Sequence, residues 1–169
     1  MRSRRLFPLV TALAVLAAPA LADGRSDWAG YAWQTIDVAD CTAGDEGRVC
    51  PLYREKWDWK RDQWVSIWVT LGQESLRLTQ RLEDNDWYDD DDVCVTAVVV
   101  DAAGRNLAVH HTNWYMTDGQ VREEVFTYPA AGLDRASTIH IGSKQCREGP
   151  HQDDAVFAEV KSRLGAATR

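Results

Sequence analysis

Hydrophobic and polar residues alternate with a period of two along most of this chain, which is the spacing of half-buried β-strands. The clearest run covers residues 64–71, where four aliphatic residues alternate with Trp64, Ser66, Trp68 and Thr70. Residues 75–82 repeat the alternation after a turn expected at Gly72-Gln73. The same pattern predicts further strands over residues 28–38, 93–101, 107–116, 121–128 and 138–141.

Residues 93–101 are apolar on both faces, which predicts a central strand covered on both sides. A hairpin loop is expected over residues 101–105 and a tighter hairpin at Asp118-Gly119, whereas residues 42–48 are interpreted as a loop. These strands and turns predict a mainly β fold, an antiparallel immunoglobulin-like sandwich or flattened barrel of about seven strands.

One segment has helical spacing instead. Val156, Val160 and Leu164 recur every four residues after Asp153, an acidic residue suited to a first helical turn. The pattern predicts a short C-terminal helix near residues 153–164 whose apolar stripe packs on the sheet.

The chain begins with the features of a secretory signal peptide. Three arginines precede an apolar run over residues 6–16 and the small-residue site Ala20-Leu21-Ala22. We expect residues 1–22 to be removed, which leaves residues 23–169 as a single disulfide-bonded β domain. The run is too short for a membrane span. The mature chain is therefore expected to be periplasmic or secreted, with no membrane insertion after cleavage.

The charge balance narrows the choice of partners. The leader holds three of the 19 basic residues and none of the 26 acidic ones, so the mature chain carries a net charge of about −10. Nucleic acids and anionic membrane surfaces are bound through clusters of lysine and arginine. We therefore expect no nucleic-acid partner.

An oxidising compartment favours pairing of the four cysteines. We expect a Cys41–Cys50 disulfide that closes a short loop and a Cys94–Cys146 disulfide that ties the middle of the chain to its last strand. The absence of a C-x-x-C pair makes a metal site the weaker interpretation.

The sequence lacks the common catalytic motifs, including those of serine hydrolases, zinc proteases and nucleotide-binding enzymes. A dispersed enzymatic site remains an alternative. His110 and His111 lie on opposite faces of a regular strand, so one of them is available to join His140 or a carboxylate. The simpler interpretation places one histidine in solvent and the other at the edge of the core.

Trp64 and Trp68 lie on the strand face opposite the aliphatic residues. With a two-residue loop at Gly72-Gln73, Trp68 is expected to face Arg77 and Trp64 to face Arg81 as cross-strand cation–π pairs. This arrangement predicts a binding surface for a protein or glycan. The alternatives are a purely structural ladder, or a face buried beneath the chain around Trp57 and Trp59.

The second candidate site is the acidic stretch over residues 83–92. Its carboxylates at Asp84, Asp86 and Asp89 suit a weak calcium site, since calcium takes six to eight oxygen ligands. A solvated loop without a cofactor is the alternative, because the EF-hand spacing is missing.

The sequence therefore predicts an exported, non-enzymatic binding or inhibitor-like protein of the bacterial cell envelope. Two alternatives remain: a periplasmic hydrolase with a dispersed histidine and carboxylate site, and a structural envelope component stabilised by calcium.

Overall fold

The computed structural model describes residues 30–146 and, near the C-terminus, residues 154, 155, 157–159 and 162. The expected leader over residues 1–22 lies outside this described part. Residues 30–146 contain ten strands and two short 3-10 helices. The strands are β1 (Ala32–Asp37), β2 (Thr42–Gly44), β3 (Gly47–Val49), β4 (Tyr53–Asp58), β5 (Gln63–Leu71), β6 (Ser75–Asp84), β7 (Asp91–Asp101), β8 (Asn106–Met116), β9 (Val121–Pro129) and β10 (Ala136–Gln145). The 3-10 helices are η1 (Val38–Asp40) and η2 (Leu133–Arg135).

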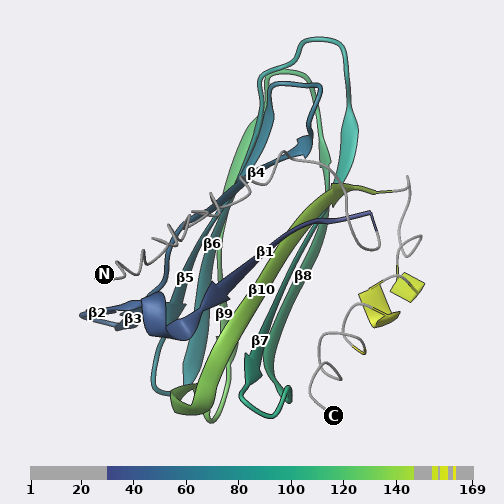
Figure 1. Ribbon diagram of the computed structural model, residues 1–169. Coiled ribbons are helices and arrows are strands. Elements are labelled where there is room, and N and C mark those ends of the chain that lie inside the picture. Colours follow the sequence, from purple (N-terminus) through teal and green to yellow (C-terminus); the bar gives the residue numbers. More distant parts are fainter. Residues whose placement is uncertain (1–29, 147–153, 156, 160–161, 163–169) are drawn as a thin grey trace, which may run out of the picture.

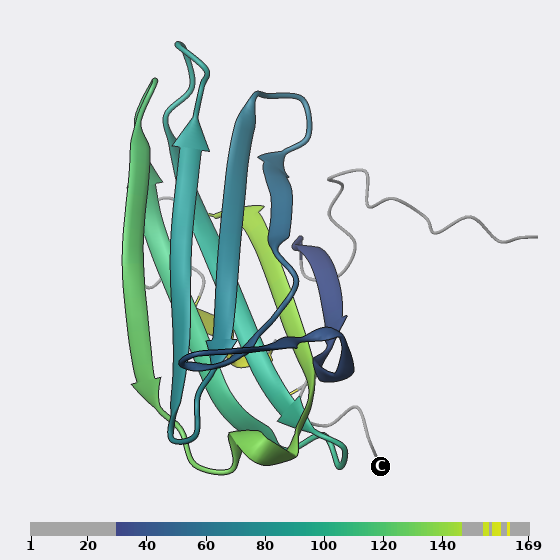
Figure 2. The ribbon, with the colours of Figure 1, turned by 90° about the vertical axis from the view of Figure 1, so that its left-hand side faces the viewer.

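The strands form two antiparallel sheets packed face to face (Figures 1 and 2). The four-stranded sheet has the order β1-β10-β7-β8, and the six-stranded sheet has the order β2-β3-β5-β6-β9 with β4 also paired to β5. The mainly β, sandwich-like fold predicted by the alternation is confirmed. The structure adds the three short strands β2, β3 and β4 to the seven expected.

These additional strands lie where the alternation is short or interrupted. β2 and β3 form a small hairpin over residues 42–49, where the sequence predicts a loop over residues 42–48. β4 pairs with β5, with Tyr53 opposite Ile67 and Asp58 opposite Gln63. Tyr53 and Trp57 of β4 are buried, so the strand contributes to the core although charged residues lie between them.

The Asp118-Gly119 turn reverses the chain but does not make the expected hairpin. Gly119 adopts a left-handed φ of 67°, and Gln120 N–H donates to the Thr117 carbonyl at 2.9 Å. However, β8 belongs to the four-stranded sheet and β9 to the six-stranded sheet, so the two strands are not paired. The turn instead carries the chain from one layer to the other.

The inward faces of both sheets share one hydrophobic core. Many of the largest buried aliphatic residues come from β5, β6 and β10, and each stabilises the fold by about 1.5–3 kcal/mol through removal from water. β7 is buried on both faces, since Val95 and Ala97 point inward while Thr96 and Val98 on the opposite face are also buried. The predicted central strand is confirmed.

The outer face of the four-stranded sheet is covered in part by aromatic residues. The Phe157 ring stacks on the His111 ring of β8 with centroids 4.0 Å apart. The described residues at 154, 155, 157–159 and 162 are helical and fall within the predicted helix, whereas its stripe Val156, Val160 and Leu164 lies outside the described residues. Membrane spans were the other helical feature to check. In the described part of the chain, no helix has the length and apolar character to span a membrane.

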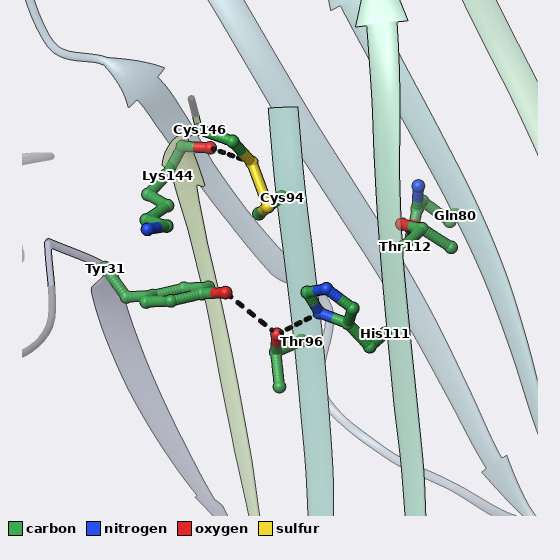
Figure 3. Close-up of a disulfide and its surroundings, with 8 residues drawn as sticks. All are labelled: Tyr31, Gln80, Cys94, Thr96, His111, Thr112, Lys144 and Cys146. Atoms are coloured by element: carbon green, nitrogen blue, oxygen red, sulfur yellow. Dashed lines mark hydrogen bonds between the residues drawn. A yellow bond between two sulfur atoms is a disulfide. The ribbon is translucent and has the colours of Figure 1, made fainter. Parts of the chain in front are cut away.

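Both expected disulfides are confirmed, and all four cysteines are paired. Cys41–Cys50 brackets the β2–β3 hairpin, and Cys94–Cys146 joins β7 to the end of β10. Figure 3 shows Cys94–Cys146 on the same strand face as Thr96. Thr96 Oγ1 donates to the Tyr31 hydroxyl at 3.2 Å and lies 2.8 Å from His111 Nδ1.

Candidate functional site

The outer face of the six-stranded sheet holds all four residues of the candidate binding surface, Trp64, Trp68, Arg77 and Arg81. Antiparallel pairing places facing residues of β4, β5, β6 and β9 on the same side of the sheet. We call this side the Trp68 face. It consists of Arg54, Lys56, Trp64, Ser66, Trp68, Thr70, Arg77, Thr79, Arg81, Glu83, Val121, Glu123, Val125 and Thr127.

The pairing of β5 with β6 differs from the expected register. Trp68 faces Thr79, and Trp64 faces Glu83, so neither faces an arginine. The prediction was wrong because the two-residue loop is Gln73-Glu74, one position later than expected, with Gly72 N–H donating to the Ser75 carbonyl at 2.8 Å. Moving the loop by one residue slides the pairing by two, which changes the neighbours and keeps every side chain on its face.

Trp64 interacts with cations from β4 instead. Its ring centroid lies 4.8 Å from Arg54 Cζ and 5.0 Å from Lys56 Nζ, and its Nε1–H donates to Asp62 Oδ1 at 2.7 Å. β4 extends the sheet beside β5, so its chain does not cover the face. Trp57 points into the core and donates its Nε1–H to Asp91 Oδ2 at 3.0 Å.

Acidic residues pair with the arginines of the Trp68 face. Arg81 lies 2.8 Å from Glu83 and 3.5 Å from Glu123, and the hydrogen bond that Arg81 donates to Glu83 raises the pKa of Arg81 above its ordinary value. Arg54 also reaches Glu83, at 3.2 Å. Arg77 pairs with Glu46 in the β2–β3 turn. The face therefore presents fixed, mostly balanced charges rather than a basic patch.

Between these ion pairs the face exposes apolar side chains. Trp68 is 40% exposed and shares a row across the strands with Thr79 and with Val125, which is 49% exposed. Val121 of this face is also exposed, as is Val49, which pairs with Thr70 from β3. Threonine is small, so the centre of this row leaves the Trp68 ring open on one side. Exposed aromatic and aliphatic groups gathered on one face are typical of interaction surfaces.

Beside this row the surface is hollowed. The hollow has a volume of about 420 Å³, and its lining is mostly polar, with hydroxyl groups and one ion pair. It is lined by Glu46, Thr70, Gly72, Ser75, Arg77, Val125 and Thr127. Thr70, Arg77 and Thr127 form the row next to the Trp68 row. The β2–β3 hairpin crosses this end of the face in Figure 2. The hollow is thus a polar depression in the row of side chains next to that of Trp68.

Two glycines bring the β2–β3 and β5–β6 turns into contact beside this hollow. Gly47 has a left-handed φ of 137°, and a Cβ there would collide with the Leu71 carbonyl oxygen. A Cβ at Gly72 would lie 3.0 Å from the Ser75 carbonyl oxygen and 3.4 Å from that of Glu46. The wall of the hollow is therefore positioned by backbone packed against backbone.

The acidic loop does not gather its three candidate calcium ligands. Asp84 is buried, and its Oδ1 accepts a hydrogen bond from Asp86 N–H at 3.0 Å. Burial also raises the pKa of Asp84. Asp86 and Asp89 instead flank Arg61, at 3.9 Å and 3.2 Å. Across the part of the chain that the structure describes, no three His, Cys, Asp or Glu side chains are placed to hold a metal ion.

Calcium binding stays a prediction with a direct test. If Asp84, Asp86 and Asp89 bind calcium in the folded protein, calcium at 100 times its dissociation constant stabilises the fold by about 2.7 kcal/mol. Thermal melting in millimolar calcium and in chelator measures this difference, and Asp89→Asn serves as the ligand variant. Equal midpoints in the two buffers would contradict the prediction.

The histidines lie on different faces. His110 is buried between the sheets, where its Nε2–H donates to Gln80 Oε1 at 2.9 Å and its Nδ1 accepts from the Tyr128 hydroxyl at 2.8 Å. Burial, with a smaller contribution from the charge of His111, lowers the pKa of His110 to about 4. His110 is thus a neutral core residue that links β8 to β6 and β9.

His111 and His140 both lie on the outer face of the four-stranded sheet but on strands separated by β7. His140 Nδ1 lies 3.1 Å from Thr35 Oγ1, and burial lowers the pKa of His140. His111 contacts Thr96 and Phe157. The three histidines do not converge on a common point, so the dispersed enzymatic site has no support from their arrangement.

Comparisons with known proteins supply no family. No family model matches the sequence, and no curated protein does. Among solved structures, the RGD-containing host-selective toxin Ptr ToxA of Pyrenophora tritici-repentis has a TM-score of 0.29 at 8% identity, over 64% of this chain and 93% of the toxin chain. The enzymatically active domain of tailspike protein 4 of bacteriophage CBA120 has a TM-score of 0.27 at 12% identity, over 75% of this chain and 19% of that one. At these TM-scores neither resemblance informs the fold or the function.

Sequence reasoning placed Trp64, Trp68, Arg77 and Arg81 on one face but missed the residues that β9 and the β2–β3 turn add to it. The alternation of residues 121–128 contained a usable signal, because Val121, Glu123 and Val125 occupy alternate positions and share a face. Glu46 had no such signal, since it reaches Arg77 only through packing between two distant turns.

Proposed function

We propose that this chain is an exported, non-enzymatic binding or inhibitor-like protein of the bacterial cell envelope, and that the Trp68 face is its working surface for a protein or glycan. The observation that carries the proposal is the exposed Trp68 ring in the row next to the hollow lined by Arg77, which we call the Arg77 hollow. Rigid aromatic side chains on a supported surface are the residues that most often dominate binding energy.

The chemistry around Trp68 favours a glycan over a protein. A sugar ring has an apolar face that stacks on an indole and hydroxyl groups that require polar partners. The hollow supplies such partners in Thr70, Thr127 and the Glu46–Arg77 ion pair, which lie in the row next to Trp68. Its volume of about 420 Å³ lies within the range of small-molecule sites.

Export supports the same proposal. The leader pattern over residues 1–22 is that of a secretory signal peptide, and both disulfides suit an oxidising compartment. Periplasmic or secreted proteins meet envelope glycans and proteins directly.

Trp68→Ala is expected to weaken binding to purified cell-wall glycan by about tenfold or more, as for other aromatic hot spots. The unfolding free energy should change by about 1 kcal/mol or less, because the side chain is 40% exposed and gives up few core contacts. Sedimentation with cell-wall glycan measures binding, and urea denaturation measures stability.

Trp87→Ala is the matched control, because it removes an exposed tryptophan from a different surface. A photocrosslinker at position 68 tests for a protein partner in an envelope extract. Glycan binding that survives Trp68→Ala would contradict the glycan assignment, and the absence of both glycan binding and a specific crosslink would overturn the proposed face.

A further inference from the structure

The end of the sandwich at the β4–β5 and β6–β7 connections carries a second exposed aromatic surface. The exposed fractions are 49% for Trp59, 71% for Trp87, 92% for Tyr88 and 54% for Tyr115. We call this surface, defined by Trp59, Trp87, Tyr88 and Tyr115, the aromatic tip. Four large aromatic side chains this open at one end of a molecule are unusual for a surface without a partner.

Hydrogen bonds hold the loops of the aromatic tip together. Asn85 N–H donates to the Asp62 carbonyl at 3.0 Å, and Gly119 N–H donates to the Asp86 carbonyl at 3.0 Å. Asp89 N–H donates to Asp118 Oδ1 at 2.8 Å. These bonds join three connections that are distant in sequence, so the aromatic residues are presented on a supported surface.

Trp87 contacts one of the neighbouring loops. Its ring lies against the β8–β9 turn, where a Cβ at Gly119 would be 3.7 Å from two ring atoms. The Tyr115 hydroxyl donates to Asp90 Oδ2 at 2.7 Å, which positions that ring beside the same loop. Side chains that are ordered before binding lose little conformational freedom when a partner docks.

The charge of this end selects the partner. The segments 58–62, 85–90 and 115–120 contain six aspartates, whereas their cations are only Lys60, which lies 5.5 Å from the Trp59 ring centroid, and Arg61, which pairs with Asp58, Asp86 and Asp89. The aspartates therefore leave this end with an excess of negative charge. Cations bind well where aromatic faces and carboxylates lie together, through cation–π contacts and charge-assisted hydrogen bonds. The molecule uses aromatic–cation pairs internally, with Arg122 Cζ 3.9 Å from the Trp114 centroid.

We propose that the aromatic tip is a docking surface for a cationic segment of a partner protein, with lysine or arginine side chains seated against Trp87 and Tyr88 among the tip aspartates. This surface is separate from the Trp68 face and does not depend on the function proposed for that face.

The test uses the mature protein and a synthetic peptide of alternating lysine and glycine, with a glutamate–glycine peptide as the opposite charge. The wild type should bind the lysine peptide and not the glutamate peptide in calorimetric titration. Trp87→Ala combined with Tyr88→Ala should weaken lysine-peptide binding about tenfold, since two exposed cation–π contacts of about 0.5–1 kcal/mol each are lost with no change in charge.

Trp68→Ala is the matched control and should leave lysine-peptide binding unchanged. A melting curve confirms that each variant is folded. Equal affinity of the wild type and the double variant would show simple attraction to an acidic protein and would overturn the proposal. The proposal would also be overturned if the wild type did not bind the lysine peptide. Loss of binding in Trp68→Ala alone would overturn it too, because the peptide would then bind the Trp68 face.

Discussion

Replacement of both Cys94 and Cys146 by alanine is expected to lower the free energy of unfolding by about 4 kcal/mol. The disulfide closes a loop with a sequence separation of 52, so its loss gives the unfolded chain much more conformational freedom. Urea denaturation of the oxidised wild type and of the double variant measures the difference. A loss of this size is a large share of the stability of a small domain.

The control is the matching replacement of Cys41 and Cys50, which close a loop with a sequence separation of only 9. The same chain-entropy relation gives about 2.7 kcal/mol for that disulfide. We therefore expect the Cys94–Cys146 variant to be the less stable of the two. The reverse order would show that the constraint on the unfolded chain does not account for the effect.

Acidification is expected to remove about 3 kcal/mol of stability through His110 alone. The folded-state pKa of His110 is about 4, against 6.5 for an unperturbed histidine. Between these values the unfolded chain binds a proton that the folded chain does not. The stabilisation is therefore fully present above pH 6.5 and is lost as the pH falls toward 4.

Unfolding free energies of the wild type and of His110→Gln, measured across this pH range, isolate the contribution. Burial raises the pKa values of Asp84 and Asp91, so these groups act in the opposite direction on acidification. Both carboxyls are present in the two proteins and cancel in the comparison. Parallel pH profiles would contradict a buried neutral His110.

The sequence was most informative where one face of a strand is uniformly apolar. β5, β6 and β7 could be predicted because a strand must place alternate residues on opposite faces, and any other assignment would expose Val65 or Ile67. β4 was missed because its buried residues Tyr53 and Trp57 are separated by charged side chains. Because only two of the six residues of β4 are buried, its sequence shows no regular alternation of hydrophobic and polar residues.

Long-range features were beyond the same reasoning. The pattern of residues 107–128 resembles a hairpin whether its two strands pair in one sheet or cross between sheets. The choice depends on how the inward side chains of β8 and β9 meet, as when Trp114 packs near Phe126 with ring centroids 6.0 Å apart. Such contacts join the two layers and leave no periodic signal in either strand.

For the candidate site, the sequence predicted which residues of β5 and β6 lie on the outward face, but it did not predict which of them lie next to one another. Trp68 was assigned correctly to the outward face, yet its partner Thr79 was not foreseen because the position of the hairpin loop was one residue off. The Arg61 contacts with Asp86 and Asp89 were likewise invisible, since Arg61 comes from a different connection.

The contact between Gly47 and Leu71 has a practical consequence for redesigning what this protein binds. Backbone atoms of two turns position the wall of the Arg77 hollow, while Thr70, Arg77 and Thr127 only furnish its surface. Libraries varied at these three positions would therefore alter ligand preference within an unchanged frame. Position 47 must be held constant as glycine in any such library, because any larger residue would separate the two turns and deform the frame itself.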